Sequence, residues 1–346
     1  MADPNDFGIK TRRPTGAVPW PLILLEGEDK AGKSWAAAQF TAHEGLGERF
    51  WIDVGEGAAD EYYAIPGADY LVIEHDGTFD DILAQVRAVR RQAASVDVAD
   101  GGKPTLLVID SMTNIWQQLK EWTHQRAQKS RSGQRQRAAD PDAPVRAAPT
   151  FWNDTHARNQ TLMDLLMTFP GIVVITARGK EVSAIGDDGN PIEGQREWKV
   201  EASKNIGFES TGWVRLRRTE PPTVVGVRSV HAGIRPGVDK PLVKPDFSLE
   251  WLIFDYMRCD PASAYVRDLK VSEESTLMKI DAATDLDTVE EVTKEFRAIY
   301  GRQLRVERAA AQRWRYLKAL REQAAAEGES SGHTADSDST DTEQAT

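Results

Sequence analysis

The segment Gly27–Ser34, which reads GEDKAGKS, constrains this chain more than any other part of the sequence. It matches G-x-x-x-x-G-K-[ST], a pattern in which glycines let successive backbone N–H groups surround phosphate groups. A short apolar run, residues 21–25, precedes it, and the Ala-rich stretch 34–43 that follows is compatible with a helix. A strand, then the loop, then a helix is the order that a phosphate-binding loop requires. The positive end of the helix dipole then faces the phosphates and attracts them.

The loop predicts a binding site for ATP and Mg²⁺. Lys33 is expected to reach the β- and γ-phosphates, and the Ser34 hydroxyl is expected to bind Mg²⁺. Asp110 ends the apolar run 105–110 and is expected to hold Mg²⁺ through water, although Asp110 or Ser111 could also cap the helix that follows. The predicted nucleotide-binding residues of the loop are Gly27, Glu28, Asp29, Lys30, Ala31, Gly32, Lys33, Ser34 and Trp35.

Apolar runs alternate with helical segments along the first half of the chain. Strand-like runs occupy 49–54, 70–73, 105–110 and 171–176, and helical spacing occupies 79–94 and 153–169. This alternation predicts an α/β fold with a mostly parallel sheet covered on both faces by helices. A hairpin is predicted around 187–190, followed by antiparallel strands at 212–217 and 223–228.

The pattern also predicts how the chain is divided. The Gln-, Arg-, Ala- and Pro-rich stretch 124–149 is expected to be a long loop or a disordered insertion. The predicted parts are an N-terminal arm at 1–20, a core at 21–245, a helical region at 246–326 and an acidic disordered tail at 327–346.

Charge and cysteine content narrow the classes of function. The net charge is −11, but the last twenty residues hold six acidic residues and no Lys or Arg, so the rest of the chain carries about −5. Binding to DNA is therefore not excluded. One cysteine, Cys259, rules out an intramolecular disulfide and a multi-cysteine zinc site. Because neither a membrane-spanning apolar run nor a secretory leader is recognisable, we expect a cytoplasmic protein with no membrane partner.

The run Val108–Ser111, with a glutamate after the preceding strand, resembles the RecA-like recombinase ATPases. In that family a motif of the type Asp-x-Glu-x-x-x-Asp-x-x-Tyr follows the second strand, and this chain has DVGEGAADEYY at Asp53–Tyr63, one residue longer before the glutamate. The resemblance implies that Glu56 positions the attacking water, that Asp60 meets the adenine amino group and that Tyr63 stacks on the ring. Taken alone, Glu56 could be a solvated loop acid and Tyr63 an aromatic that covers the core.

The resemblance covers about residues 20–230. It implies a P-loop NTPase with a RecA-like core, a mostly parallel twisted sheet with helices on both faces and a small helical C-terminal region. It also places a sensor of the γ-phosphate at the end of the strand 171–176, where the usual Gln is missing and Thr176 or Arg178 must substitute. Arg178 could equally be a structural ion-pair partner. The chain looks most like phage-encoded RecA-core proteins of single-strand annealing, which implies the host cytoplasm.

Two segments are candidates for DNA binding, because the family places its DNA-binding loops in these regions. The first is a cationic run without acids, suited to phosphate contact, or else a passive insertion. Its candidate residues are Arg126, Lys129, Arg131, Arg135 and Arg137. The second is the predicted hairpin, where cations and an aromatic ring could bind phosphates and stack bases, although nearby acids weaken this interpretation. Its candidate residues are Arg196, Trp198, Lys199 and Lys204.

The leading functional prediction is a DNA-dependent ATPase that assembles on single-stranded DNA and promotes annealing or strand exchange. We expect a homo-oligomer, as a ring or a filament, with a single-strand binding protein as a further candidate partner. The alternatives are a helicase or DNA-packaging motor, a small-molecule P-loop kinase and a nucleotide-switched scaffold. The acidic tail could compete with DNA for a basic groove, or it could simply keep the protein soluble.

Overall fold

The computed structural model describes residues 13–142, 144–186, 190–232, 238, 240–267, 273–300 and 302–332. The chain forms two compact units, Met1–Asp268 and Leu269–Thr346. None of the described helices is long and apolar enough to cross a membrane.

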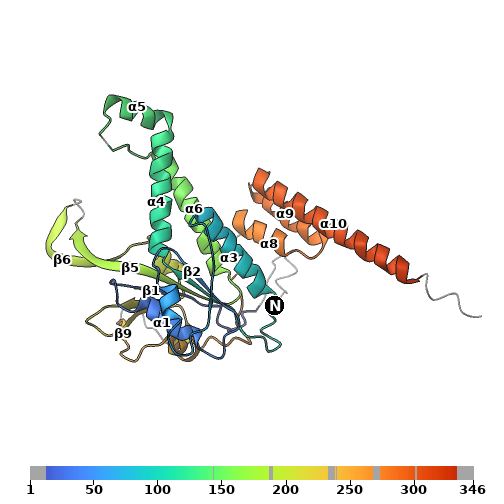
Figure 1. Cartoon of the computed structure of the whole chain (residues 1–346), viewed down its shortest axis with the longest axis horizontal. Helices are drawn as coiled ribbons and strands as arrows, with labels where there is room; N and C mark the ends of the chain where they lie inside the picture. The colour runs from blue at the N-terminus through green and yellow to red at the C-terminus, as the bar shows by residue number, and fades with distance from the viewer. Residues whose placement is uncertain are drawn as a thin grey trace, which may run out of the picture. The chain divides into compact units, whose positions relative to one another are not determined.

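The first unit is built on one mixed sheet, whose described strands follow the order β3-β2-β4-β5-β1-β7-β8-β9, with β6 paired to β5 (Figure 1). The strands are β1 Leu22–Gly27, β2 Arg49–Asp53, β3 Leu71–Val72, β4 Leu106–Asp110, β5 Ile172–Ile185, β6 Pro191–Val200, β7 Gly212–Leu216, β8 Thr223–Val227 and β9 Leu242–Val243. Pairing is parallel from β3 through to β7 and antiparallel beyond it. The predicted α/β fold with a mostly parallel sheet is therefore confirmed.

Helices connect these strands and cover the sheet. They are α1 Lys33–Thr41, α2 Ala59–Tyr62, α3 Phe79–Ala94, α4 Met112–Lys129, α5 Arg131–Ala139, α6 Pro149–Met167 and α7 Ile206–Glu209. Helices α3, α4 and α6 pack together on one side of the sheet. Helix α1 contributes Ala37, Ala38 and Phe40 to a core cluster with alternate residues of β1, β4 and β5, which places α1 on the other side.

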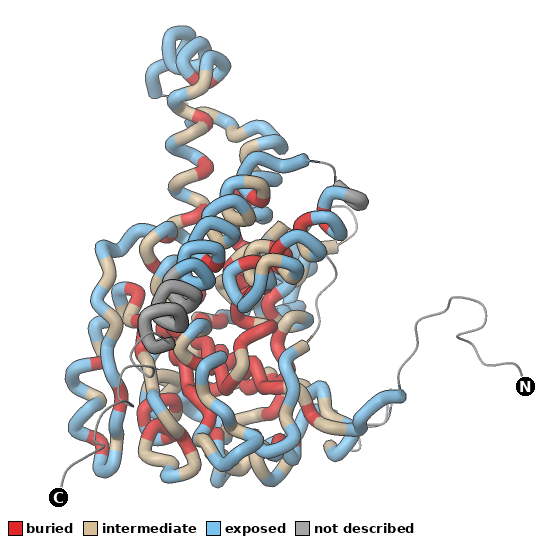
Figure 2. The backbone as a smooth tube through the Cα atoms, turned by 90° about the vertical axis from the view of Figure 1, so that its right-hand side faces the viewer, coloured by how far each residue is buried: buried red, intermediate tan, exposed pale blue. Residues whose placement is uncertain are grey.

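The central strands are the most deeply buried part of this unit, as the red segments in Figure 2 show. Every residue of β1 and β4 is buried. Parallel strands covered on both faces are mostly apolar, because neither face meets water, and the carboxylates Glu26 and Asp110 are exceptions at the strand ends. This burial fixes the ends of β1, β2 and β4, which carry the predicted site residues.

The predicted loop at 124–149 is wrong over most of its length. Helix α4 continues to Lys129, α5 follows, and α6 already begins at Pro149, so that a helical projection rises from the sheet (Figure 1). Buried residues Leu119, Thr123 and Ala127 lie along one side of α4. Helices α4 and α5 bury only a narrow stripe of residues and therefore need few apolar side chains. Low hydrophobic content is for this reason compatible with helix as well as with loop.

The boundaries of the first unit also differ from the predicted ones. Val18 and Trp20 belong to its core, although the arm was expected to extend to residue 20. At the other end, a π-helical turn at Trp251–Tyr256 buries Leu252 and Ile253 in the same core, so this unit extends to Asp268 rather than 245. The predicted hairpin is present as β5 and β6, with residues 187–189 of its turn outside the described residues.

The second unit contains three described helices, α8 Glu273–Ala282, α9 Leu286–Tyr300 and α10 Leu304–Gly332. Small apolar clusters join them, one formed by Ile280, Phe296 and Val306 and another by Ala283, Val289 and Leu317. The helical C-terminal region is thus confirmed. Helix α10 continues to Gly332, into the segment expected to be disordered, and residues 333–346 of the predicted tail lie outside the described residues.

Candidate nucleotide site

The loop between β1 and α1 has the geometry of a phosphate cradle. Gly27 has φ 153°, and a Cβ at this position would lie 1.8 Å from the Leu216 carbonyl oxygen of β7, so a side chain cannot fit. Gly32 has φ 90°, in the left-handed region that favours glycine. The loop lines a cavity of about 410 Å³, within the usual range of ligand pockets. Of the predicted loop residues, the six from Asp29 to Ser34 line this cavity.

Lys33 points into this loop. Its Nζ donates hydrogen bonds to the carbonyl oxygens of Glu28 at 2.7 Å and Gly27 at 3.2 Å. Burial lowers the pKa of Lys33, and the nearby carboxylates of Asp29, Asp110 and Glu56 oppose that shift. An anionic phosphate would offset the cost of burying this ammonium group, because it supplies a full negative charge. The loop carbonyl oxygens supply only partial negative charges.

Glu56 reaches the same cavity from the neighbouring strand. Asp53 ends β2 in register with Asp110 of β4, and its carboxylate accepts hydrogen bonds from four backbone N–H groups. These N–H groups belong to residues 56–59. Asp53 is therefore a structural residue that fixes the turn carrying Glu56.

Three side-chain donors hold one oxygen of the Glu56 carboxylate. Its Oε1 accepts from Ser111 Oγ at 2.8 Å, from Arg178 Nη2 at 3.0 Å and from Asn114 Nδ2 at 3.1 Å. Ser111 stands where many P-loop ATPases carry a glutamate, and here it anchors a glutamate delivered by the adjacent strand. The carboxylate is thus fixed beside the loop, whereas a solvated loop acid would have no such set of partners.

Asp110 is buried at the end of β4 and fits a divalent cation. Its Oδ1 accepts a hydrogen bond from Thr176, whereas its buried Oδ2 has no hydrogen-bond partner among the described residues. Burial raises the pKa of Asp110, hydrogen bonding to Ser34 and Thr176 opposes that shift, and the Glu56 and Asp53 charges add to it. A Mg²⁺ ion beside the Asp110 carboxylate and the Ser34 hydroxyl would satisfy that oxygen and offset the burial.

The two sensor candidates have different surroundings. Thr176 is fully buried and holds Asp110, so it lies behind the metal-binding position. Arg178 lines the cavity, where its guanidinium pairs with Glu56 and lies 3.7 Å from the Asp29 carboxylate. Arg178 therefore connects β5 to both the loop and Glu56, which makes it the better placed of the two to contact a γ-phosphate.

The aromatic residues beside the cavity differ from the expected ones. Tyr62 lines the cavity and meets the half-exposed Trp35 ring edge-on at 6.0 Å between centroids. Tyr63 is 55% exposed and packs edge-on against Tyr70, and neither it nor Asp60 lines the cavity. Tyr62 is thus the ring that lines the cavity, and the predicted Trp35 packs against it from outside the cavity lining.

A buried glutamate links the loop to the β5–β6 hairpin. Glu26, just before Gly27, is fully buried and accepts from Trp198 Nε1 at 2.6 Å, Arg215 Nε at 2.7 Å and Trp213 Nε1 at 3.2 Å. The guanidinium of Arg215 also lies over the Trp198 ring at 4.6 Å. Trp198 is therefore held against the core, whereas Arg196, Lys199 and Lys204 are exposed.

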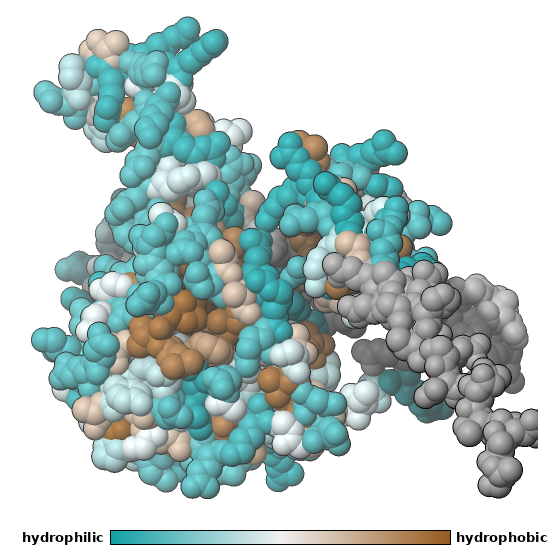
Figure 3. All heavy atoms as spheres, turned by 45° about the vertical axis from the view of Figure 1, so that its right-hand side comes forward, coloured by the Kyte–Doolittle hydropathy of each residue, from teal (hydrophilic) through white to brown (hydrophobic). Residues whose placement is uncertain are grey.

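The cations of the helical projection fall into two groups. Arg126 pairs with Asp154 of α6 at 2.6 Å and lies over the rings of Trp122 and Phe151, so it holds α4 to α6. The other predicted cations of this segment are exposed at the end of α4 and along α5, namely Lys129, Arg131, Arg135 and Arg137. The outer end of this projection is hydrophilic in Figure 3.

Similarity between this chain and known proteins is low. No protein-family model and no curated protein matches the sequence. The RadB recombinase structure is similar at 17% identity and a TM-score of 0.33, over 60% of this chain and 81% of that one. The flagellar accessory protein FlaH from Methanocaldococcus jannaschii gives 11% and 0.25, over 61% and 79%. The assembled ATPase EscN of the enteropathogenic E. coli type III secretion system gives 12% and 0.31, over 82% and 57%.

The parallel strand order, the phosphate loop after β1 and the carboxylates at the ends of β2 and β4 together identify the architecture. The first unit is an α/β domain with a P-loop between its first strand and first helix. At the identities and TM-scores found, the similar structures say nothing about what this chain binds.

Several residues of the site were not singled out from the sequence. They are Ser111 in its role as an anchor, Asn114, Tyr62 and the group formed by Glu26, Trp213 and Arg215. A glutamate inside an otherwise apolar strand, as in LILLEG, was the available signal for the last group, because a buried charge needs partners.

Proposed function

We propose that this chain is a MgATP-hydrolysing, DNA-dependent ATPase that acts on single-stranded DNA in annealing or strand exchange. The observation that carries the proposal is the Glu56 carboxylate, fixed by Ser111, Asn114 and Arg178 beside the phosphate loop. A carboxylate held at the mouth of a P-loop is suited to orient water for attack on a terminal phosphate.

The surrounding residues divide the remaining tasks. Lys33 and the backbone N–H groups of the loop bind the phosphates, and Ser34 with Asp110 would hold Mg²⁺. Bound Mg²⁺ supplies positive charge to the phosphate oxygens. Arg178 would exchange its contact with Glu56 for the γ-phosphate, because both are anions within its reach. Such an exchange frees the Glu56 carboxylate for water.

The same arginine offers a route from nucleotide to DNA. Arg178 lies on β5, which continues into the exposed hairpin with Arg196 and Lys199. On the neighbouring side, the exposed cations of α5 form a second surface suited to sequence-independent phosphate contact. We propose that these two surfaces bind single-stranded DNA and that the hairpin responds to the nucleotide through Arg178 and Trp198.

Self-assembly as a ring or filament is part of this proposal. The outer strands β3 and β9 expose Leu71, Val72 and Val243, and unpaired sheet edges with apolar side chains favour association with another chain. A single-strand binding protein remains a candidate partner, and a phage setting stays a prediction from the resemblance.

The deciding experiment measures steady-state ATP hydrolysis with Mg²⁺, alone and with saturating single-stranded oligonucleotide. We expect single strands to stimulate turnover and duplex of the same length to stimulate it less. Hydrolysis that is indifferent to DNA would contradict the proposal and favour a kinase or a nucleotide-switched scaffold. The variant Glu56→Gln distinguishes this site from a contaminating ATPase, because it removes the carboxylate while it keeps the shape of the side chain.

A further inference from the structure

Helix α10 of the second unit is unusually basic for a protein that is acidic as a whole. Residues 302–322 contain seven Lys or Arg and two acidic residues, whereas 273–297, covering α8 and most of α9, contains eight acidic residues and three Lys or Arg. The net charge of the whole chain is −11. The remainder of α10, residues 323–332, adds two acidic residues and no Lys or Arg. Positive charge in this unit is therefore concentrated on the first two thirds of α10, which indicates an anionic partner for that part of the helix.

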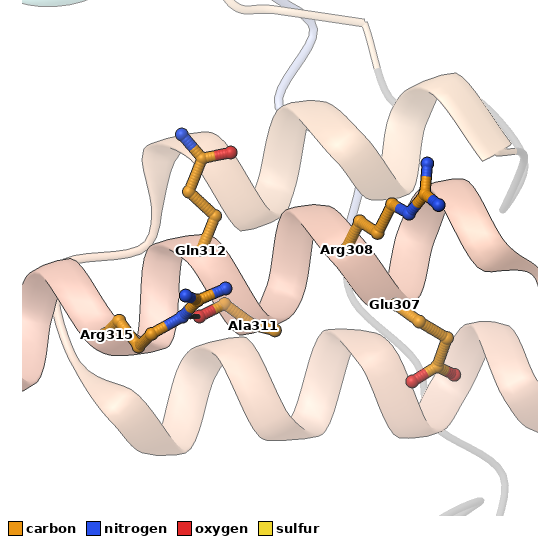
Figure 4. Close-up of a pocket in the computed structure, with 5 residues that line it drawn as sticks. All are labelled: Glu307, Arg308, Ala311, Gln312 and Arg315. Carbon is orange, nitrogen blue, oxygen red and sulfur yellow. Dashed lines mark hydrogen bonds between the residues drawn. The ribbon is translucent and has the colours of Figure 1, made fainter.

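The buried residues of α10 define which of its faces is exposed. Val306 and Leu317 are buried, and the partly buried Ala310 packs with them against α8 and α9. The opposite face carries Arg308, Ala311, Gln312 and Arg315, all exposed, and together with Glu307 they line a shallow depression of about 540 Å³ (Figure 4). Two arginines thus flank a small residue, which leaves room for a ligand to approach the helix.

The cations of α10 are not equivalent. Arg313 donates two hydrogen bonds to the Ala283 carbonyl oxygen, and Arg305 pairs with Glu273 at 3.0 Å, so both hold α10 to α8 and the residue that follows it. Arg308 has no ion-pair partner among the described residues, and Arg315 donates only to the Ala311 carbonyl oxygen of its own helix. Arg308 and Arg315 are therefore available to an outside anion.

Exposed aromatic rings lie on either side of these arginines. Trp314 is 41% exposed with the Lys318 ammonium 5.3 Å from its ring centre, and Tyr316 is 54% exposed with the Arg313 guanidinium at 5.1 Å. Phosphate groups need only the cations, whereas unpaired bases can stack on exposed rings. The combination distinguishes a single strand from a duplex, whose bases are already stacked.

We propose that the outer face of α10 is a further binding surface for single-stranded nucleic acid, with Arg308 and Arg315 on the phosphates and Trp314 under a base. This inference rests on the proposed function for its class of partner. It differs from that function in site, because α10 belongs to the second unit, whereas the hairpin and α5 belong to the first.

The test uses the full-length protein and a fluorescent single-stranded oligonucleotide, with binding followed by anisotropy at several salt concentrations. Arg308→Gln combined with Arg315→Gln is expected to weaken binding roughly tenfold and to flatten the log–log salt slope by about 0.7 for each phosphate that is no longer neutralised. Trp314→Ala is expected to weaken binding on the order of tenfold while the salt slope stays nearly constant. Far-UV circular dichroism confirms that each variant is folded.

The matched control is Lys279→Gln combined with Lys294→Gln, which removes the same charge from exposed positions on α8 and α9. Binding within twofold of the parent is expected for the control. Equal weakening by both double variants would overturn the assignment to α10, as would unchanged binding in the arginine double variant. A matching decrease on duplex DNA would overturn the assignment to single strands. If single strands stimulate hydrolysis normally while the α10 variants bind normally, this surface is wrong and the proposed function stands.

Discussion

The nucleotide cavity and the helical projection both contain arginines and acids, but the two regions use them differently. In the cavity, Arg178 joins Glu56 and Asp29 at the ends of parallel strands, where the fully buried strands β1 and β4 fix the backbone positions. In the projection, Arg126 and Arg158 lie over the Trp122 ring and hold α4 to α6. Only the outer end, along α5, exposes cations without packing them.

The position of an arginine within the fold therefore determines whether it contacts the site, packs between helices or remains exposed. Rigid strand ends can hold a carboxylate to within hydrogen-bonding distance of three donors, as at Glu56. Exposed arginines on helices are not held in one position by neighbouring groups. They suit contacts with nucleic-acid phosphates, which do not depend on the base sequence. The substitutions below test the two halves of this comparison.

The largest effect is expected for Lys33→Ala. The variant removes the cation at the centre of the loop, and catalysis of phosphoryl transfer depends mainly on such electrostatic stabilisation. We expect no measurable ATP hydrolysis in a steady-state assay, while Lys103→Ala, at an exposed position outside the cavity, hydrolyses ATP normally. Turnover within threefold of the parent protein would show that the site is assigned incorrectly.

Glu56→Gln should reduce kcat by roughly 10²–10⁴ while ATP binding stays nearly intact, which is the range expected when a general base or water-orienting group is removed. Rapid-quench kinetics together with a fluorescent-nucleotide binding assay separates these two quantities. Glu61→Gln, an exposed acid on α2, serves as the matched control. A change confined to KM would instead make Glu56 a binding residue.

The exposed cations of the projection provide a smaller and graded test. Replacing Lys129, Arg131, Arg135 and Arg137 with Gln should weaken single-strand binding on every sequence and flatten the salt slope by roughly 0.7 for each phosphate that is no longer neutralised. The free energy of unfolding should change by about 0.5 kcal/mol or less, since these positions are exposed.

Arg126→Gln gives the opposite pattern in the same segment. It removes a stacked ion pair, so it should lower the free energy of unfolding by about 1–2 kcal/mol and leave the salt slope unchanged. If the salt slope falls for Arg126→Gln and holds for the other four, the division of this segment into packing and binding arginines is wrong.

An effect on stability alone is expected for Trp198→Phe, which removes one hydrogen bond to the buried Glu26 carboxylate. An acceptor left without its donor in a buried position costs about 1–3 kcal/mol, measurable by urea denaturation. Trp213→Phe removes the longer, 3.2 Å bond to the same carboxylate and should cost less. An unchanged free energy of unfolding for Trp198→Phe would mean that the hairpin is not anchored through this residue.

Much of the first unit was predictable because its core strands leave an unambiguous pattern. Apolar runs such as LLVID at β4 are buried on both sides, and their length and flanking residues mark them as strands. The extension of α4 and the presence of α5 were not predictable from hydrophobicity, because helices that bury one stripe resemble a polar loop in composition. Helix α4 is stabilised by packing against α6. The sequence of α4 alone does not show which other helix it packs against.

Within the site, the sequence predicted Lys33 and Ser34 from a local motif, Asp110 from the end of an apolar run, and Glu56 from a resemblance. It could not give the partners of Glu56, since Ser111, Asn114 and Arg178 lie far from it along the chain. It also named Tyr63 for the adenine ring, although Tyr62 is the neighbour that lines the cavity. Adjacent residues on a short helix point about 100° apart, so a shift of one residue changes which ring faces the site.

The sequence by itself determined the phosphate loop, because its function depends on backbone conformation and a helix start within eight consecutive residues. The tertiary structure alone decided how that loop is coupled to the rest of the molecule. Glu26 meets Trp198 and Trp213, and Arg178 meets Glu56, across separations of more than a hundred residues. These contacts exist because parallel pairing of β1, β4 and β5 brings distant strand ends to one edge of the sheet, where buried charges must find partners.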